Sequence, residues 1–127
     1  MKAFFEFSLF AIFTLIFSAV NYGQSGLQSQ DTEPTVIRLS QIDGAFTTPS
    51  LELPAGDYIF EVTNDGVAKD LGFYLQDEQD AAVPNAGLVE LIGKDETSRT
   101  GVVTLRPGTF RYSCPLNPTP HYVLVVR

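Results

Sequence analysis

The chain of 127 residues contains one cysteine, Cys114, and one histidine, His121, which stand close together near its end. The six residues 115–120 separate them, and three of the six are prolines. Each proline fixes a backbone angle and lacks an N–H donor, so this connection is short and stiff. A thiolate and an imidazole at the two ends of a rigid loop can bind a soft metal ion or act as a nucleophile and its base.

Several interpretations of this pair stay open. In the plainest one, Cys114 is a small core residue, as free cysteines often are, and His121 is a polar cap on the last strand. In another, the two side chains bind Cu(I), which accepts thiolate and imidazole, with Asp70 or water as an additional donor. A copper ion shared between two chains is a variant. Zinc is disfavoured because structural zinc sites use a complete tetrahedral ligand set.

A catalytic Cys–His pair is also disfavoured. Such a pair needs a third, orienting group, for which Asn117 or Asp70 are the candidates. A sulfur that points inward behind three prolines offers poor access to a substrate. We therefore expect a protein that is not an enzyme.

Short apolar segments separated by glycine, proline and asparagine must position the pair. In Asp57–Asn64, alternation places Tyr58, Phe60 and Val62 on one face. The other predicted strands are Thr35–Leu39, Ser50–Leu53, Leu71–Leu75, Thr97–Leu105, Thr109–Cys114 and Tyr122–Val126. Short strands at this spacing predict an all-β sandwich or barrel. The one exception, residues 77–92, is expected to hold a short helix or an irregular excursion.

Alternation also predicts where the sulfur lies. Cys114 shares a face with Phe110 and Tyr112, so it points into the core if these aromatic residues do. The last strand is apolar on both faces, which predicts a central position in its sheet. We expect the sulfur and an imidazole nitrogen of His121 about 4 Å apart, at one end of the sandwich beside residues 71–73.

The first twenty residues are typical of a secretory signal peptide. Lys2 gives a basic start, Leu9–Phe17 is apolar, and small residues follow. The apolar run is shorter than the roughly 20 residues that a membrane-spanning helix needs. We predict a signal peptide over residues 1–23, a flexible tether over 24–34 and one domain over 35–127. The mature protein is then periplasmic or secreted, with no membrane span.

The charge balance narrows the choice of partners. The chain has 15 Asp or Glu against eight Lys or Arg, for a net charge of −7. Nucleic-acid binding needs clustered basic residues, so it is not expected. A single cysteine excludes an internal disulfide.

The Cys114–His121 arrangement resembles the cupredoxin family of blue copper proteins. In that family the second-to-last strand ends in a Cys ligand, and a short loop carries a His before the last strand. The segments Glu61–Gly66, Gly72–Leu75 and Leu105–Cys114 are also similar to family segments. The resemblance covers about residues 35–127 and implies a Greek-key β-sandwich. An immunoglobulin-like sandwich is the alternative.

The resemblance also implies an incomplete type 1 copper ligand set. The first His ligand would fall near Leu71, where Lys69, Asp70 and Leu71 stand, and the only Met is Met1. A blue copper centre needs two imidazoles, a thiolate and a weak axial ligand. The implied metal is copper at Cys114 and His121, with Asp70 as an additional donor, and rapid electron transfer is not expected.

Two other functions stay open. One is a metal-free cupredoxin scaffold that acts as a binding or structural module. The other is electron transfer with the missing ligands supplied by a second chain or a partner. The sequence leaves open a protein partner, or a donor or acceptor of the metal, and does not identify it.

Overall fold

The computed structural model describes residues 33–127. The expected signal peptide, and the expected tether up to residue 32, lie outside the described residues. The strands are β1 (Thr35–Ile42), β2 (Ala45–Phe46), β3 (Ser50–Leu53), β4 (Gly56–Asn64), β5 (Tyr74–Gln76), β6 (Thr97–Arg99), β7 (Val103–Leu105), β8 (Gly108–Ser113) and β9 (Tyr122–Val126). Within residues 33–127 no helix is long and apolar enough to span a bilayer.

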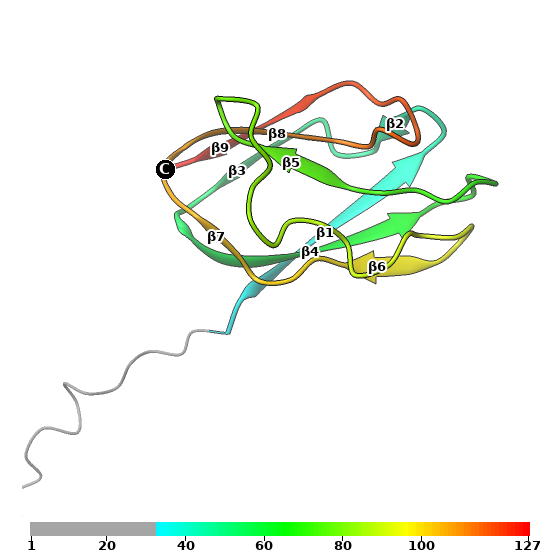
Figure 1. The fold of residues 1–127 in the computed structure, drawn as a ribbon, viewed down its shortest axis with the longest axis horizontal. Coiled ribbons are helices and arrows are strands. Elements are labelled where there is room, and N and C mark those ends of the chain that lie inside the picture. Colours follow the sequence, from blue (N-terminus) through cyan, green and yellow to red (C-terminus); the bar gives the residue numbers. More distant parts are fainter. Residues whose placement is uncertain (1–32) are drawn as a thin grey trace, which may run out of the picture. The chain divides into compact units, whose positions relative to one another are not determined.

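The strands form two layers (Figure 1). One sheet has the order β2-β1-β4-β6, with β7 also paired to β4, and the other has the order β3-β9-β8-β5. The pairs β1–β4 and β3–β9 are parallel, and the remaining pairs are antiparallel. This architecture confirms the prediction of an all-β sandwich. The last strand, β9, lies between β3 and β8, so its predicted central position is also confirmed.

The core between the sheets follows the predicted alternation. Tyr58, Phe60 and Val62 of β4 are at most 4% exposed, whereas the residues between them are half-buried. From the other sheet, Tyr112 and Leu124 meet them with no exposed surface. Burying a large apolar side chain is worth about 1.5 to 3 kcal/mol relative to exposing it. These alternating positions therefore hold the two sheets together.

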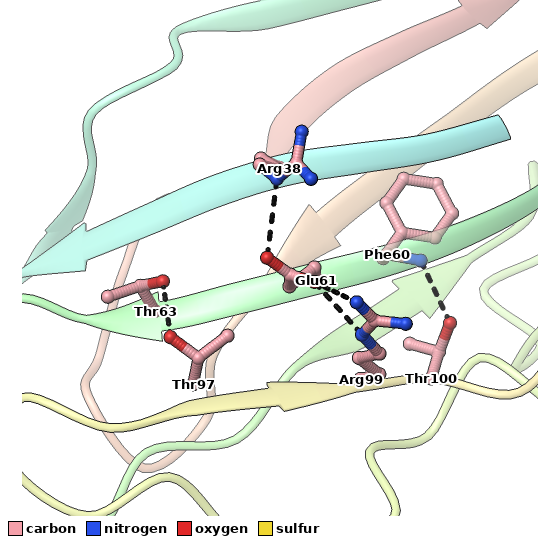
Figure 2. A network of polar contacts seen from close by, with 7 residues as sticks. All are labelled: Arg38, Phe60, Glu61, Thr63, Thr97, Arg99 and Thr100. Carbon is pink, nitrogen blue, oxygen red and sulfur yellow. Dashed lines mark hydrogen bonds and ion pairs between the residues drawn. The ribbon is translucent and has the colours of Figure 1, made fainter.

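The predicted strand over residues 97–105 is divided in two at Thr100. β6 pairs with Glu61–Thr63, β7 pairs with Gly56–Tyr58, and Thr100 lies opposite Phe60. The Thr100 hydroxyl accepts the Phe60 N–H at 3.0 Å, and the Thr100 N–H donates to the Phe60 carbonyl at 2.9 Å (Figure 2). The side chain thus replaces a backbone acceptor where the ladder is interrupted.

The outer face of the first sheet carries a cross-strand ion network. Glu61 on β4 lies between Arg38 on β1 and Arg99 on β6, with N–O distances of 3.3 and 2.7 Å (Figure 2). Next to it, the hydroxyls of Thr63 and Thr97 lie 2.8 Å apart. Opposite charges on neighbouring strands favour this register, since a one-residue slip would separate them.

Residues 77–92 contain no helix, so the irregular alternative is the correct one. The segment passes from the layer that holds β5 to the layer that holds β6 and β7 (Figure 1). Isolated bridges tie it down at both ends, from Gln76 to Ala82 and from Leu71 to Ile92. It is therefore anchored in spite of its irregular backbone.

Candidate functional site at the Cys114 end of the sandwich

Cys114 directly follows β8, and its side chain lies in the core. The residue is 1% exposed and its thiol is free. Its sulfur accepts a hydrogen bond from the backbone N–H of Gly72 at 3.3 Å. The Leu71–Phe73 segment therefore lies beside the sulfur, as predicted from the sequence.

The proline-rich loop after Cys114 folds back onto that residue. The Cys114 N–H donates to the hydroxyl of Thr119 at 2.9 Å. The Cys114 carbonyl accepts from the N–H groups of Asn117 and Thr119 at 3.4 and 3.5 Å. Because the loop's prolines have no N–H to donate, these bonds define its shape.

A buried amide network closes this end of the sandwich. Asn117 is 1% exposed and Gln41 has no exposed surface. The Asn117 side-chain N–H₂ group donates to Gln41 Oε1 at 3.3 Å and to the Ile42 carbonyl at 2.9 Å, and its oxygen accepts the Gly44 N–H at 2.8 Å. Gln41 in turn donates to the Gly72 carbonyl at 2.7 Å. Gly72 thus joins the amides to the Cys114 sulfur.

Sequence reasoning missed this network. The sequence suggests Asn117 only as an orienting group for a catalytic pair, and it suggests no role for Gln41. The sequence does contain a signal for Gln41, because it lies two residues after Leu39 and so on the same, buried face of β1. A polar side chain on a buried face requires a hydrogen-bond partner. Its partner Asn117 lies 76 residues away, and no local pattern connects the two.

The segment before Gly72 is fixed by a second buried amide. Asn64 has no exposed surface, and its side chain bonds to the backbone of Val67, Lys69 and Ile92 at 2.8 to 3.1 Å. Leu71, which stands near the position where the cupredoxin resemblance places a His ligand, is also fully buried. Its aliphatic side chain offers no donor atom to a metal ion.

His121 and Asp70 are both exposed. His121 precedes β9, in which Val123 is 44% exposed and Leu124 fully buried, so alternation places His121 on the outward-facing side with Val123. The hydrogen bonds described for Cys114 lead to Gly72, Asn117 and Thr119, and none of them leads to His121. The use of Cys114, His121 and Asp70 as ligands stays a prediction.

These donors do not fit a type 1 copper centre. Such a centre takes two imidazoles, a thiolate and a weak axial ligand, and the chain has a single histidine. Within residues 33–127, no group of three or more His, Cys, Asp or Glu side chains is placed to hold a metal ion. In this part of the chain, the sulfur accepts the Gly72 N–H, and the Gln41–Asn117 amides are joined to it through Gly72.

An apolar rim surrounds the closed end. Leu91 and Leu116 are 56% and 45% exposed. Their methyl groups lie 3.8 and 3.7 Å from the point that a Cβ on Gly72 would occupy, so both leucines pack over Gly72. Ile42, whose carbonyl Asn117 binds, is 41% exposed. We refer to Ile42, Leu91 and Leu116 as the apolar rim.

Aromatic rings pack beneath the rim. Phe46 makes edge contacts with Phe73, Tyr112 and Tyr122 at centroid distances of 5.2 to 6.2 Å, and the two tyrosines stack at 5.3 Å. The Tyr112 hydroxyl donates to the Thr48 carbonyl at 2.7 Å. Burial, and to a smaller extent the nearby Tyr122, raise the pKa of Tyr112 to about 12. Tyr112 is therefore a neutral hydrogen-bond donor over the ordinary pH range.

Solved structures with the same fold are cupredoxins. Auracyanin A, a "blue" copper protein from the green thermophilic photosynthetic bacterium Chloroflexus aurantiacus, is 17% identical with a TM-score of 0.60. The match covers 74% of this chain and 99% of auracyanin A. A mutant of amicyanin in its reduced Cu(I) form at pH 4 is 18% identical with a TM-score of 0.52, covering 72% of this chain and 82% of that one. No family model and no curated protein matches the chain.

The chain therefore has a cupredoxin-like fold, which confirms the architecture that the sequence resemblance implied. We therefore retain the cupredoxin-type sandwich and not the immunoglobulin-like alternative.

Proposed function

We propose that this chain is an exported, metal-free cupredoxin-like module that recognises another protein through its apolar rim. The observation that carries the proposal is the closed amide network. Asn117 donates to Gln41, Gln41 donates to the Gly72 carbonyl, and the Gly72 N–H donates to the sulfur, so these polar groups are satisfied within the protein. A buried polar network that is fully bonded makes a rigid, well-defined surface.

The rim supplies the means of recognition. Exposed apolar side chains grouped around a rigid centre are typical of protein interaction sites. The acidic charge argues against nucleic acid as the partner, and the signal peptide predicted over residues 1–23 supports an encounter outside the cytoplasm. Cys114, the candidate nucleophile, is 1% exposed, which favours a binding role over a catalytic one.

Two substitutions, at residues of nearly equal exposure, test the rim. Leu116→Asp places a charge in the rim, whereas Val123→Asp places one on the outward face of β9, and the parent residues are 45% and 44% exposed. When the purified chain is crosslinked in an extract of exported proteins, it is expected to capture one defined protein. Leu116→Asp is expected to abolish that capture and Val123→Asp to retain it. Equal capture by the two variants would refute the role of the rim.

Copper binding by Cys114 and His121, with Asp70 as an additional donor, is the second candidate. The Gly72 N–H favours it, because it orients the sulfur, which is the soft donor that Cu(I) prefers. Titration of the purified protein with Cu(I) and Cu(II) separates the two candidates. The metal-free proposal predicts no tight binding of either ion. Tight, colourless Cu(I) binding that is lost in both Cys114→Ser and His121→Ala would favour the second candidate.

A further inference from the structure

A separate hollow lies between β7, the start of β8 and the irregular segment after β5. Its volume is about 370 Å³, within the range of roughly 300 to 1,000 Å³ that is usual for small-molecule pockets. Phe110 lines it and precedes Cys114 by four residues of extended chain, a separation of roughly 13 Å. The hollow is therefore distinct from the Cys114 end.

The lining combines an apolar wall with charged groups. Its apolar members are Val83, Pro84, Val102 and Phe110, and its charged members are Asp77 and Arg106. Phe110 is half-buried, whereas Val102 is 43% exposed, so the wall runs from the sandwich to the surface. Pockets with an apolar wall and a few fixed polar groups bind small organic molecules and orient them.

The two charged groups have opposite signs and do not pair with each other. No ion pair of residues 33–127 includes Asp77 or Arg106. One oxygen of Asp77 accepts the N–H groups of Gln79 and Ala81 at 2.8 and 3.0 Å, which fixes the carboxylate in its turn. Two charges of opposite sign along one apolar wall, with no ion pair to another residue of 33–127, complement a molecule that carries both an ammonium and a carboxylate group.

The wall is held in place by the protein itself. The Val83 N–H donates to the Leu75 carbonyl at 3.0 Å. Asn85, which also lines the hollow, approaches Gly101 so closely that a Cβ there would lie 3.4 Å from its backbone oxygen. A preformed wall reduces the ordering that a ligand must impose, which favours binding.

We infer that this hollow binds a small organic zwitterion with an apolar body, such as an apolar α-amino acid. The ammonium group faces Asp77, the carboxylate faces Arg106, and the side chain packs on Val102 and Phe110.

Three probes with the same body but different charges test this inference. They are L-phenylalanine, its N-acetyl derivative, which lacks the ammonium, and its amide, which lacks the carboxylate. Each is titrated into ¹⁵N-labelled protein lacking the predicted leader, and the amide shifts around Gly101 and Thr104 are followed. L-phenylalanine is expected to give saturable shifts, and each derivative to bind about tenfold more weakly, because each loses one charged hydrogen-bond partner.

Single substitutions assign each charge. Arg106→Gln is expected to weaken the binding of L-phenylalanine about tenfold and to leave the binding of its amide unchanged. Asp77→Asn keeps an oxygen that can accept the N–H groups of the turn. It is expected to weaken the binding of L-phenylalanine and of its amide, but not the binding of the N-acetyl derivative. Lys94→Gln removes an exposed charge outside the lining and is expected to change nothing. The inference is overturned if L-phenylalanine gives no saturable shift, if all three probes bind equally, or if neither Arg106→Gln nor Asp77→Asn weakens the binding of L-phenylalanine.

Discussion

Asn117→Ala is the most direct perturbation of the closed end. The substitution removes three hydrogen bonds, to Gln41, Ile42 and Gly44. Ile42 and Gly44 are exposed, so water can replace the lost bonds there at about 0.5 to 1 kcal/mol each. Gln41 Oε1 belongs to a residue with no exposed surface, and an orphaned buried acceptor costs about 1 to 3 kcal/mol. The expected loss is therefore about 2 to 5 kcal/mol in the free energy of unfolding.

Urea and thermal unfolding measure this loss. For a domain of this size, 3 kcal/mol corresponds to a fall in Tm of roughly 12 to 24 °C. Gln79→Ala, which truncates an exposed amide, is the control and is expected to change the free energy by less than about 0.5 kcal/mol. A cycle with Gln41→Met should show coupling of about 1 kcal/mol or more, since the double variant leaves no orphaned amide oxygen.

The Cys114 thiol provides an independent readout. Its sulfur is held by Gly72, which is held by Gln41, which is held by Asn117. Loss of Asn117 should therefore speed the reaction of the thiol with a disulfide reagent under native conditions, whereas Gln79→Ala should not. If Asn117→Ala matched its control in both stability and thiol reactivity, the amide network would not be what closes this end.

Three further outcomes are expected. Because the pKa of Tyr112 is raised above its unfolded value, the stability linked to its proton is complete below pH 10 and is lost as the pH rises toward 12; the loss is at most about 2.7 kcal/mol. Tyr112→Phe should flatten that part of the pH–stability profile. Thr100→Val should cost about 1 to 3 kcal/mol and speed hydrogen exchange at Phe60, whose N–H loses its acceptor. Glu61→Gln should cost no more than about 1 kcal/mol and reduce the salt dependence of stability, because its two arginine partners are largely exposed.

Alternation predicted burial better than it predicted strand boundaries. Leu71, Phe73 and Leu75 are all buried as expected, yet the ladder in that region covers only Tyr74–Gln76. Burial depends on which way a side chain points, and a period of two fixes that locally. Strand limits depend on the partner strand, which a single segment does not contain. The break at Thr100 has the same origin, because it requires Phe60 opposite.

The candidate site was predictable only where it is local. The burial of Cys114 followed from its phase with Tyr112 on one strand. The amide network did not, because it joins the end of β1 to a loop 76 residues later. Both buried amides do, however, continue the apolar face of a strand: Gln41 follows Leu39 by two residues, and Asn64 follows Val62 by two residues. A polar residue at the end of such a face is a specific sign that the chain must supply a buried partner.

The same observation explains how a cupredoxin-like fold can keep its shape without a type 1 ligand set. A metal centre at the end of a sandwich fastens loops from several strands to one point. Here, Gln41 and Asn117 fasten the end of β1 and the β8–β9 loop to Gly72, and Asn64 fastens the segment that leads to Gly72. Amides can replace a metal in this role because each one donates and accepts at the same time. The Cys114 sulfur accepts the Gly72 N–H, so hydrogen bonds alone connect it to both amides.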